Sequence, residues 1–108
     1  MAFTYKVLGQ SAPSATTNTD VYTVPASTSA VLSGISLCNR GAATTYRVAV
    51  RPAGATIANQ HYIAYGVQVP SGAFLSLQGG LTLANTDVIT VYSTTGTSSF
   101  SAFGSDGN

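Results

Sequence analysis

Few side chains in this chain can do acid–base or nucleophilic chemistry. There is one histidine, His61, and the carboxylates are limited to Asp20, Asp87 and Asp106. A lone imidazole works as a general base only beside a positioned nucleophile or an orienting carboxylate, and all three aspartates lie far from His61 in the sequence. Serines are so abundant that a Ser-His-Asp set can be drawn up for almost any fold, which makes that pattern uninformative. We therefore expect no catalytic residue and no enzyme, and we place His61 on a strand at a sheet edge or interface.

No cofactor or metal site is expected either. The single cysteine, Cys38, rules out an internal disulfide framework and a cysteine-based zinc cluster. A calcium site needs clustered carboxylates, which the sequence lacks. Gly79-Gly80 is followed by neither a helical stretch nor a lysine, so it indicates a turn rather than a phosphate loop. We expect Cys38 to be a small, buried or half-buried side chain.

The arginines offer interaction chemistry instead. Arg47 and Arg51 fall on one face of a predicted strand, about 13 Å apart at the usual rise, and Arg40 lies in the preceding turn. Arginine and tyrosine are both enriched in protein interfaces. The alternative is that the arginines are solvated and prevent sheets from stacking edge to edge. The predicted protein-interface residues are Arg40, Arg47, Arg51, His61, Tyr62 and Tyr65.

The composition is poor in charge and rich in hydroxyl groups. A chain of 108 residues forms one domain; it has only seven charged residues, 6% of the total, but 28 serines and threonines. Freely diffusing domains carry about 25% charged residues, so this surface indicates a subunit packed against other protein. The alternative is a Ser/Thr-rich secreted domain.

The same numbers argue against several classes of partner. A net charge of +1 gives too few cations to bind the phosphates of a nucleic acid. No apolar run approaches the roughly 18 residues of a membrane span. The first ten residues lack the apolar core of a signal peptide, so we expect the protein to be made in a cytoplasm.

Short alternating segments separated by turn signals predict about eight strands. We expect the strand Thr44–Arg51 to alternate cleanly. We expect one bulge at Gly34, in the strand before it, and another at Gly66. Val31, Ile35 and Leu37 are expected to share one face. The predicted strands are Phe3–Leu8, Asp20–Val24, Val31–Cys38, Thr44–Arg51, Gln60–Val69, Ala73–Leu77, Asp87–Ser93 and Ser98–Phe103.

The spacing of these strands predicts a single small antiparallel β-sandwich. The long polar loop after the first strand favours a Greek-key or jelly-roll path over a meander, and Asp87–Ser93 is apolar enough on both faces to be central. Phe3, Tyr5 and Val7 are expected to form a half-buried face. Residues 1–19 are predicted to be a strand with an arm or loop, and residues 104–108 a flexible tail.

Several segments resemble a known group of proteins. These segments are YTVPA, the strand ending CNR, YRVAVRPAGA, HYIAY, DVITVYS and FSAFGS, and they span Val21 to Asp106. They are similar to small β-sandwich structural proteins of tailed bacteriophages, and the size resembles that of capsid decoration (cement) proteins. The resemblance implies a virion protein that binds the outer shell as a homo-oligomer, typically a trimer, and clamps neighbouring major capsid subunits. It identifies no catalytic or metal-binding residue.

Two alternatives remain open at this stage. A tail, fibre or baseplate accessory protein can be built on the same kind of sandwich. A carbohydrate-binding β-sandwich module is disfavoured because the chain has no tryptophan and few carboxylates to bind sugar hydroxyls. Residues 1–18 lie outside the resemblance, and we expect them to reach a neighbouring subunit by adding a strand to its sheet.

Overall fold

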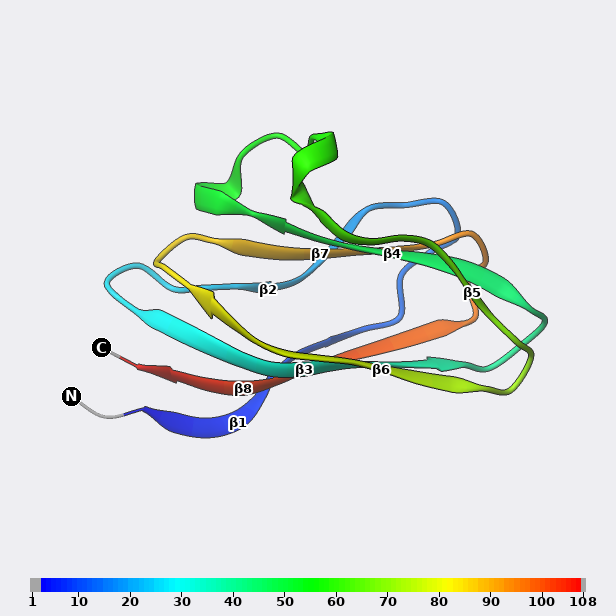
Figure 1. Cartoon of the computed structure of the whole chain (residues 1–108), viewed down its shortest axis with the longest axis horizontal. Coiled ribbons are helices and arrows are strands. Elements are labelled where there is room, and N and C mark those ends of the chain that lie inside the picture. The colour runs from blue at the N-terminus through cyan, green and yellow to red at the C-terminus, as the bar shows by residue number, and fades with distance from the viewer. Residues whose placement is uncertain (1–2, 108) are drawn as a thin grey trace.

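The computed structural model of the protein describes residues 3–107, apart from the side chains of residues 77–79. Eight strands and two short 3-10 turns form two stacked layers (Figure 1). In chain order the elements are β1 (Thr4–Ser11), β2 (Thr19–Thr23), β3 (Ser29–Asn39), β4 (Thr44–Arg51), η1 (Pro52–Gly54), η2 (Asn59–His61), β5 (Tyr62–Val69), β6 (Phe74–Leu83), β7 (Val88–Ser93) and β8 (Ser98–Gly107).

The strand order is that of a jelly roll. One sheet has the order β1-β8-β3-β6 and the other β2-β7-β4-β5. Strand β1 pairs with β8, β2 with β7, β3 with β6 and β4 with β5, all antiparallel. This is the pattern of one long hairpin, its halves β1–β4 and β5–β8, rolled up so that alternate pairs fall in opposite sheets. The predicted antiparallel sandwich with a jelly-roll path is confirmed.

Alternation along the strands builds the core between the sheets. In β4 the side chains of Tyr46 and Val48 point inward and are buried, and β7 is buried over almost its whole length. Strand β7 lies between β2 and β4, which confirms the central position expected for Asp87–Ser93. The largest fully buried apolar side chains are Phe100, Leu32, Ile89, Val24, Val48, Val69 and Val91.

Both predicted bulges are present, and one of them changes a face assignment. The register of β5 against β4 shifts around Gly66, and that of β3 shifts between Leu32 and Gly34. An extra residue in a strand reverses the inside–outside alternation beyond it. Val31 therefore points away from the face that carries Ile35, and the expectation that the two share a face is wrong.

The N-terminal strand is longer and more exposed than the sequence predicts. Strand β1 continues through Gly9 to Ser11 and pairs with β8 of its own chain, and the expected reach of residues 1–18 to a neighbouring subunit stays a prediction. At Gly9 the backbone lies so close to Val21 of β2 that a Cβ would collide with the Val21 carbonyl. Phe3, Tyr5 and Val7 are exposed, not half-buried.

The C-terminal segment is also a strand. Gly104–Gly107 are the last residues of β8, with Gly104 paired to Leu32 and to Lys6 on either side, so the predicted flexible tail is wrong for these residues. Asn108, the last residue of that predicted tail, lies outside the described residues. Likewise β6 continues through Gly79-Gly80, where a break was expected, although its register against β3 shifts there, because β6 pairs with β3 on both sides of the two glycines.

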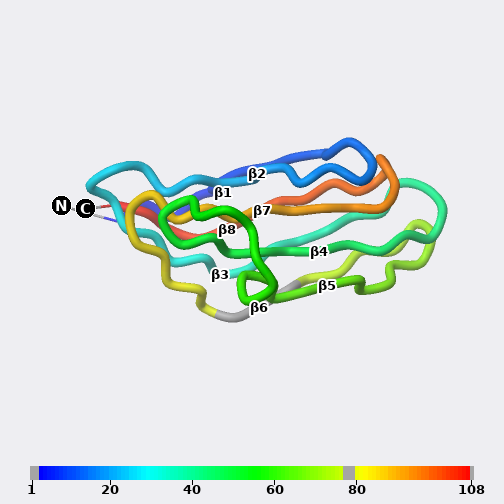
Figure 2. The backbone as a smooth tube through the Cα atoms, turned by 90° about the horizontal axis from the view of Figure 1, so that it is seen from above, coloured from blue at the N-terminus to red at the C-terminus, as the bar shows by residue number. Residues whose placement is uncertain are grey.

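The layers leave two long outer faces. The molecule measures 44 × 27 × 20 Å. Seen from above, β1 and β2 line one long edge, and β5 and β6 line the other (Figure 2). The connection that carries η1 and η2 lies over the outer side of the β2-β7-β4-β5 sheet (Figure 1). The outer face of the β1-β8-β3-β6 sheet carries no such cover among the described residues.

Candidate interaction surfaces

The outer face of the β1-β8-β3-β6 sheet carries a group of exposed apolar side chains at one end. Val7 lies opposite Phe103, and Ser105 lies between Tyr5 and Val31 in the strand pairing, so their side chains share this face. The exposed fractions run from 37% for Val31 to 87% for Tyr5. We call this group the apolar face: Phe3, Tyr5, Val7, Val31 and Phe103.

The apolar face contains no charged side chain. Lys6 alternates with Tyr5 and Val7 and points to the other side of the sheet, where its Nζ lies 3.1 Å from the Asp106 Oδ1. Farther along the same face the strands present small polar side chains, with Gln10 donating a hydrogen bond of 3.2 Å to Ser101. Water solvates such an apolar group poorly, and exposed groups of this kind are typical of contact sites.

The opposite outer face, on the β2-β7-β4-β5 sheet, brings together tyrosines and an arginine. Pairing places Arg47 of β4 between Tyr65 of β5 and Tyr92 of β7. The Arg47 guanidinium carbon lies 4.3 Å from the Tyr65 ring centroid and 4.1 Å from that of Tyr92. The Tyr62 ring meets Tyr65 edge-on at 4.9 Å. We call Arg47, Tyr62, Tyr65 and Tyr92 the Tyr–Arg cluster.

Arg51 lies on the same face but is held within the molecule. Its Nη2 is 2.9 Å from the Asp20 Oδ1, and its Nε donates to the Thr90 hydroxyl at 2.9 Å. Thr90 in turn donates to the same Asp20 oxygen at 2.9 Å. A further guanidinium nitrogen of Arg51 donates to the carbonyls of Gly54, the last residue of η1, and of Ala55, which follows it. Arg51 therefore fixes the η1 segment to β2 and β7, which is a structural role.

Two of the predicted interface residues lie elsewhere. Arg40 sits at the β3–β4 turn, where it donates to the Ser99 hydroxyl at 2.8 Å and to the Gly96 carbonyl at 3.2 Å. His61 is not on a strand: it ends η2, is buried, and accepts a hydrogen bond of 3.0 Å from the Ala58 N–H through Nδ1. The strand position expected for His61 is therefore wrong, because its ring closes a tight turn; its place in a protein interface stays a prediction.

Cys38 is exposed, so the expectation of a buried or half-buried side chain is wrong. It lies on β3, two positions beyond Ser36, on the outer side of the β1-β8-β3-β6 sheet. Its cross-strand neighbours are Ser99 and Phe74, and Phe74 is itself exposed. The outward side of β3 is open to solvent here, which the alternation alone does not disclose.

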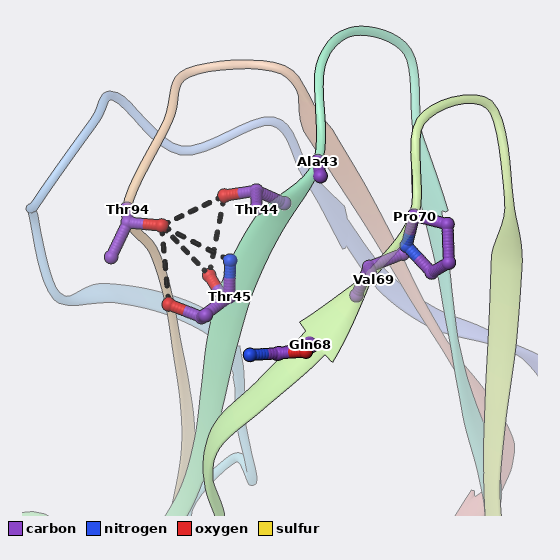
Figure 3. A pocket seen from close by; sticks show the side chains of 7 residues that line it. All are labelled: Ala43, Thr44, Thr45, Gln68, Val69, Pro70 and Thr94. Carbon is purple, nitrogen blue, oxygen red and sulfur yellow. Dashed lines mark hydrogen bonds between the residues drawn. The ribbon is translucent and has the colours of Figure 1, made fainter.

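A hydroxyl-rich hollow of about 620 Å³ opens at the end of the sandwich near the β3–β4 turn (Figure 3). The Thr94 hydroxyl makes hydrogen bonds with two others that line the hollow: it lies 2.8 Å from the Thr44 hydroxyl and 3.2 Å from that of Thr45. Thr94 also receives the Thr45 N–H at 3.1 Å. These hydroxyls satisfy one another and no titratable side chain lines the hollow, so we assign it no chemistry.

A buried ionic contact ties the sheets together near the ends of the chain. The Tyr22 hydroxyl of β2 donates to the Asp106 Oδ2 of β8 at 2.8 Å, and Lys6 contacts the other carboxylate oxygen. Burial and then the bond to Asp106 raise the pKa of Tyr22 well above its usual range. The bond from Tyr22, helped by Lys6, lowers the pKa of Asp106, although burial opposes this.

Within residues 3–107 the structure offers no metal site: no three His, Cys, Asp or Glu side chains come together there. In the same part of the chain, no helix is long and apolar enough to cross a membrane.

Sequence reasoning thus found part of the Tyr–Arg cluster and missed the apolar face. Arg47, Tyr62 and Tyr65 do come together, and Arg51 lies beside them. Tyr92 was missed as a member, although its place in β7, one residue after Val91, puts it on the outward side. No sequence signal marked the apolar face, because exposed and buried apolar positions alternate in the same way. Comparison of the chain with family models, with curated proteins and with solved structures finds no match.

Proposed function

We propose that the protein is a non-enzymatic structural component of a bacteriophage particle, in the first place a capsid decoration protein. In this role it binds the outer shell as a homo-oligomer, a trimer by the resemblance, and stabilises contacts between major capsid subunits. The observation that carries the proposal is the apolar face: a chain with seven charged residues exposes five large apolar side chains together on one sheet.

The apolar face supports a permanent contact better than a transient one. Long-lived protein interfaces resemble a domain core cut in half and are more apolar than ordinary surface. Tyr5 and Phe103 can supply the aromatic anchors that dominate such contacts. The low charge of the chain fits the same role, since a subunit held in a particle does not need charge repulsion to remain dispersed. Jelly rolls are also among the folds used in viral shells.

Copy number in purified particles tests the location. Quantitative mass spectrometry against the major capsid protein should find close to one copy of this chain for each shell subunit. A small, fixed number of copies would instead support the alternative role as a tail, fibre or baseplate accessory protein. Absence from the particle would overturn the virion proposal.

A pair of matched variants tests the surface. Replacing Tyr5 by serine should weaken binding to particles that lack the protein by about thirtyfold, because an anchoring aromatic contributes about 2 kcal/mol. The control is Phe74→Ser, which removes an exposed aromatic from the far end of the same sheet. Equal binding by both variants and the wild type would show that the apolar face is not the docking surface.

A further inference from the structure

Arg47 differs from the other three basic residues in having no polar partner among the described residues. Lys6 contacts Asp106, Arg51 contacts Asp20, and Arg40 donates to Ser99. Within the part of the chain that the structure describes, Arg47 makes no hydrogen bond and no ion pair. Its guanidinium instead contacts the Tyr65 and Tyr92 rings, with the guanidinium carbon over each ring.

The two rings hold the guanidinium in place, and among the described residues its N–H groups have no partner. An arginine side chain normally loses much rotational freedom when it binds, but here the ring contacts have already restricted that freedom. The N–H donors lie in the plane of the guanidinium, so a partner approaches them within that plane. The side chain is half-buried, which strengthens any ionic contact that it makes.

The residues around Arg47 favour the binding of an anion. No carboxylate of the described residues already pairs with its guanidinium. The carboxylate of Asp20, on β2 of the same sheet, is already engaged by Arg51 and Thr90. The face around Arg47 therefore keeps one uncompensated positive charge, edged by tyrosine rings. A planar carboxylate matches the fork of a guanidinium with two parallel hydrogen bonds, which is the geometry of arginine–carboxylate pairs.

We propose that the Tyr–Arg cluster is a recognition site for the side-chain carboxylate of an aspartate or glutamate on a partner protein. This inference goes beyond the proposed function and does not depend on it, since the cluster lies on the sheet opposite the apolar face. Together the two faces would let one subunit hold a different neighbour on each side.

A protein carboxylate fits better than an acidic sugar. Sugar rings are bound by stacking on the open, flat face of an aromatic side chain, but one face of Tyr65 and one of Tyr92 are covered by Arg47. Tyr62 restricts Tyr65 further by meeting it edge-on, with an angle of 85° between the rings. Tyrosine and arginine are instead both enriched in the energetic centre of protein interfaces.

Nuclear magnetic resonance of the Arg47 Nε–Hε group tests the site directly. The probe is a peptide Gly-Glu-Gly capped at both ends, and the matched control is capped Gly-Gln-Gly, which has the same shape without the charge. The glutamate peptide should shift the Arg47 signal saturably, and the glutamine peptide should not. Equal behaviour of the two peptides, or no shift with either, would overturn the proposal.

Variants distinguish specific binding by the Tyr–Arg cluster from attraction to positive charge alone. Arg47→Lys keeps the charge but loses the fork and the stacking, and Tyr65→Ala removes one ring; each should weaken binding of the glutamate peptide about tenfold. Arg40→Gln, which removes a positive charge at the β3–β4 turn, should leave binding of the glutamate peptide unchanged. If Arg40→Gln weakens binding as much as Arg47→Lys, the effect is general electrostatics and the site is refuted. If glucuronate binds Arg47 more tightly than the glutamate peptide, the assignment to a protein partner is refuted.

Discussion

The bond between Tyr22 and Asp106 makes the clearest quantitative prediction from this structure. It joins β2 of one sheet to β8 of the other, with a donor–acceptor distance of 2.8 Å and both residues buried. Tyr22→Phe removes only the hydroxyl group and leaves the ring in the core. A hydrogen bond to a charged group contributes about 1.5–3 kcal/mol. Asp106 keeps its contact with the half-exposed Lys6 in the variant, so we expect a loss of about 2 kcal/mol.

The loss should be visible in both chemical and thermal unfolding. With about 2.1 cal/mol/K of unfolding entropy per residue, a domain of this length loses about 4 °C of Tm for each kcal/mol. Tyr22→Phe should therefore lower Tm by about 8 °C at neutral pH. The control is Tyr46→Phe, because Tyr46 is equally buried and packs edge-on against Phe100, and among the described residues its hydroxyl has no hydrogen-bond partner. We expect it to cost less than about 0.5 kcal/mol.

Acid provides a second, independent readout of the same bond. The pKa of Asp106 is lowered in the folded protein from its ordinary value of 3.8. A carboxyl group whose folded pKa lies below its unfolded pKa stabilises the fold fully above the unfolded value, and that stability is lost as the pH falls through the folded value. The free energy of unfolding should therefore decrease below about pH 4 in the wild type and decrease less in Tyr22→Phe.

Urea unfolding at several pH values between 7 and 2 measures the free energy of unfolding of the wild type, Tyr22→Phe and Tyr46→Phe. The reasoning would be refuted by equal destabilisation of Tyr22→Phe and Tyr46→Phe at neutral pH. It would be refuted equally if the free energy of unfolding changed with pH in the same way for Tyr22→Phe and the wild type. The tyrosine hydroxyl would then not be what lowers the pKa of Asp106.

Three further predictions concern single positions. Gly9→Ala should lower the free energy of unfolding by about 3 kcal/mol in urea titrations, because the new Cβ meets the Val21 carbonyl; Gly66→Ala, in open space at φ 67°, should cost only about 1–2 kcal/mol. Asp87→Ala should cost about 2 kcal/mol, since the carboxylate accepts two backbone N–H groups at 2.9 Å, and Asp87→Asn should cost less. Exposed Cys38 should react with a thiol reagent in the folded protein as fast as in urea; strong protection would contradict its exposure.

Much of the fold could be predicted because alternation and turn residues act locally. The segment DVITVYS is apolar on both sides and became the inner strand β7. Gly66 interrupts the alternation of its strand, and the register shifts there. The long polar loop after the first strand favoured a Greek-key or jelly-roll path over a meander, but the partner of each strand comes from the structure.

The ends of the chain could not be predicted because their order comes from distant contacts. Gly104 to Gly107 are small or polar and have the composition of a tail. They form a strand because β3 pairs with them on one side and β1 on the other. Asp106 is buried between the sheets, where its carboxylate accepts the Tyr22 hydroxyl from the opposite sheet. Neither fact leaves a mark on the local sequence.

The candidate site was predictable where it depended on a single strand pair. Arg47 and Tyr65 face each other because β4 and β5 are neighbours in the sheet, and their outward positions follow from alternation. The apolar face depends instead on three strands far apart in the chain and on the bulge that turns Val31 outward. An apolar residue in a pattern indicates a face, but only the assembled sheets show whether another layer covers that face.

The two outer faces differ in chemistry, and salt should therefore separate their contributions to any binding. A contact made through Arg47 is ionic and half-exposed, so raising the ionic strength from low values to 0.5 M should weaken it as the Debye length shortens. A contact made through Tyr5 and Phe103 is apolar, and sulfate salts should leave it unchanged or strengthen it. A partner lost in sodium chloride but retained by Tyr5→Ser engages the Tyr–Arg cluster. A partner that tolerates salt but is lost with Tyr5→Ser engages the apolar face. If binding to one partner responds in the same way to both changes, the two faces do not act separately, and the picture of a subunit with a different neighbour on each side is wrong.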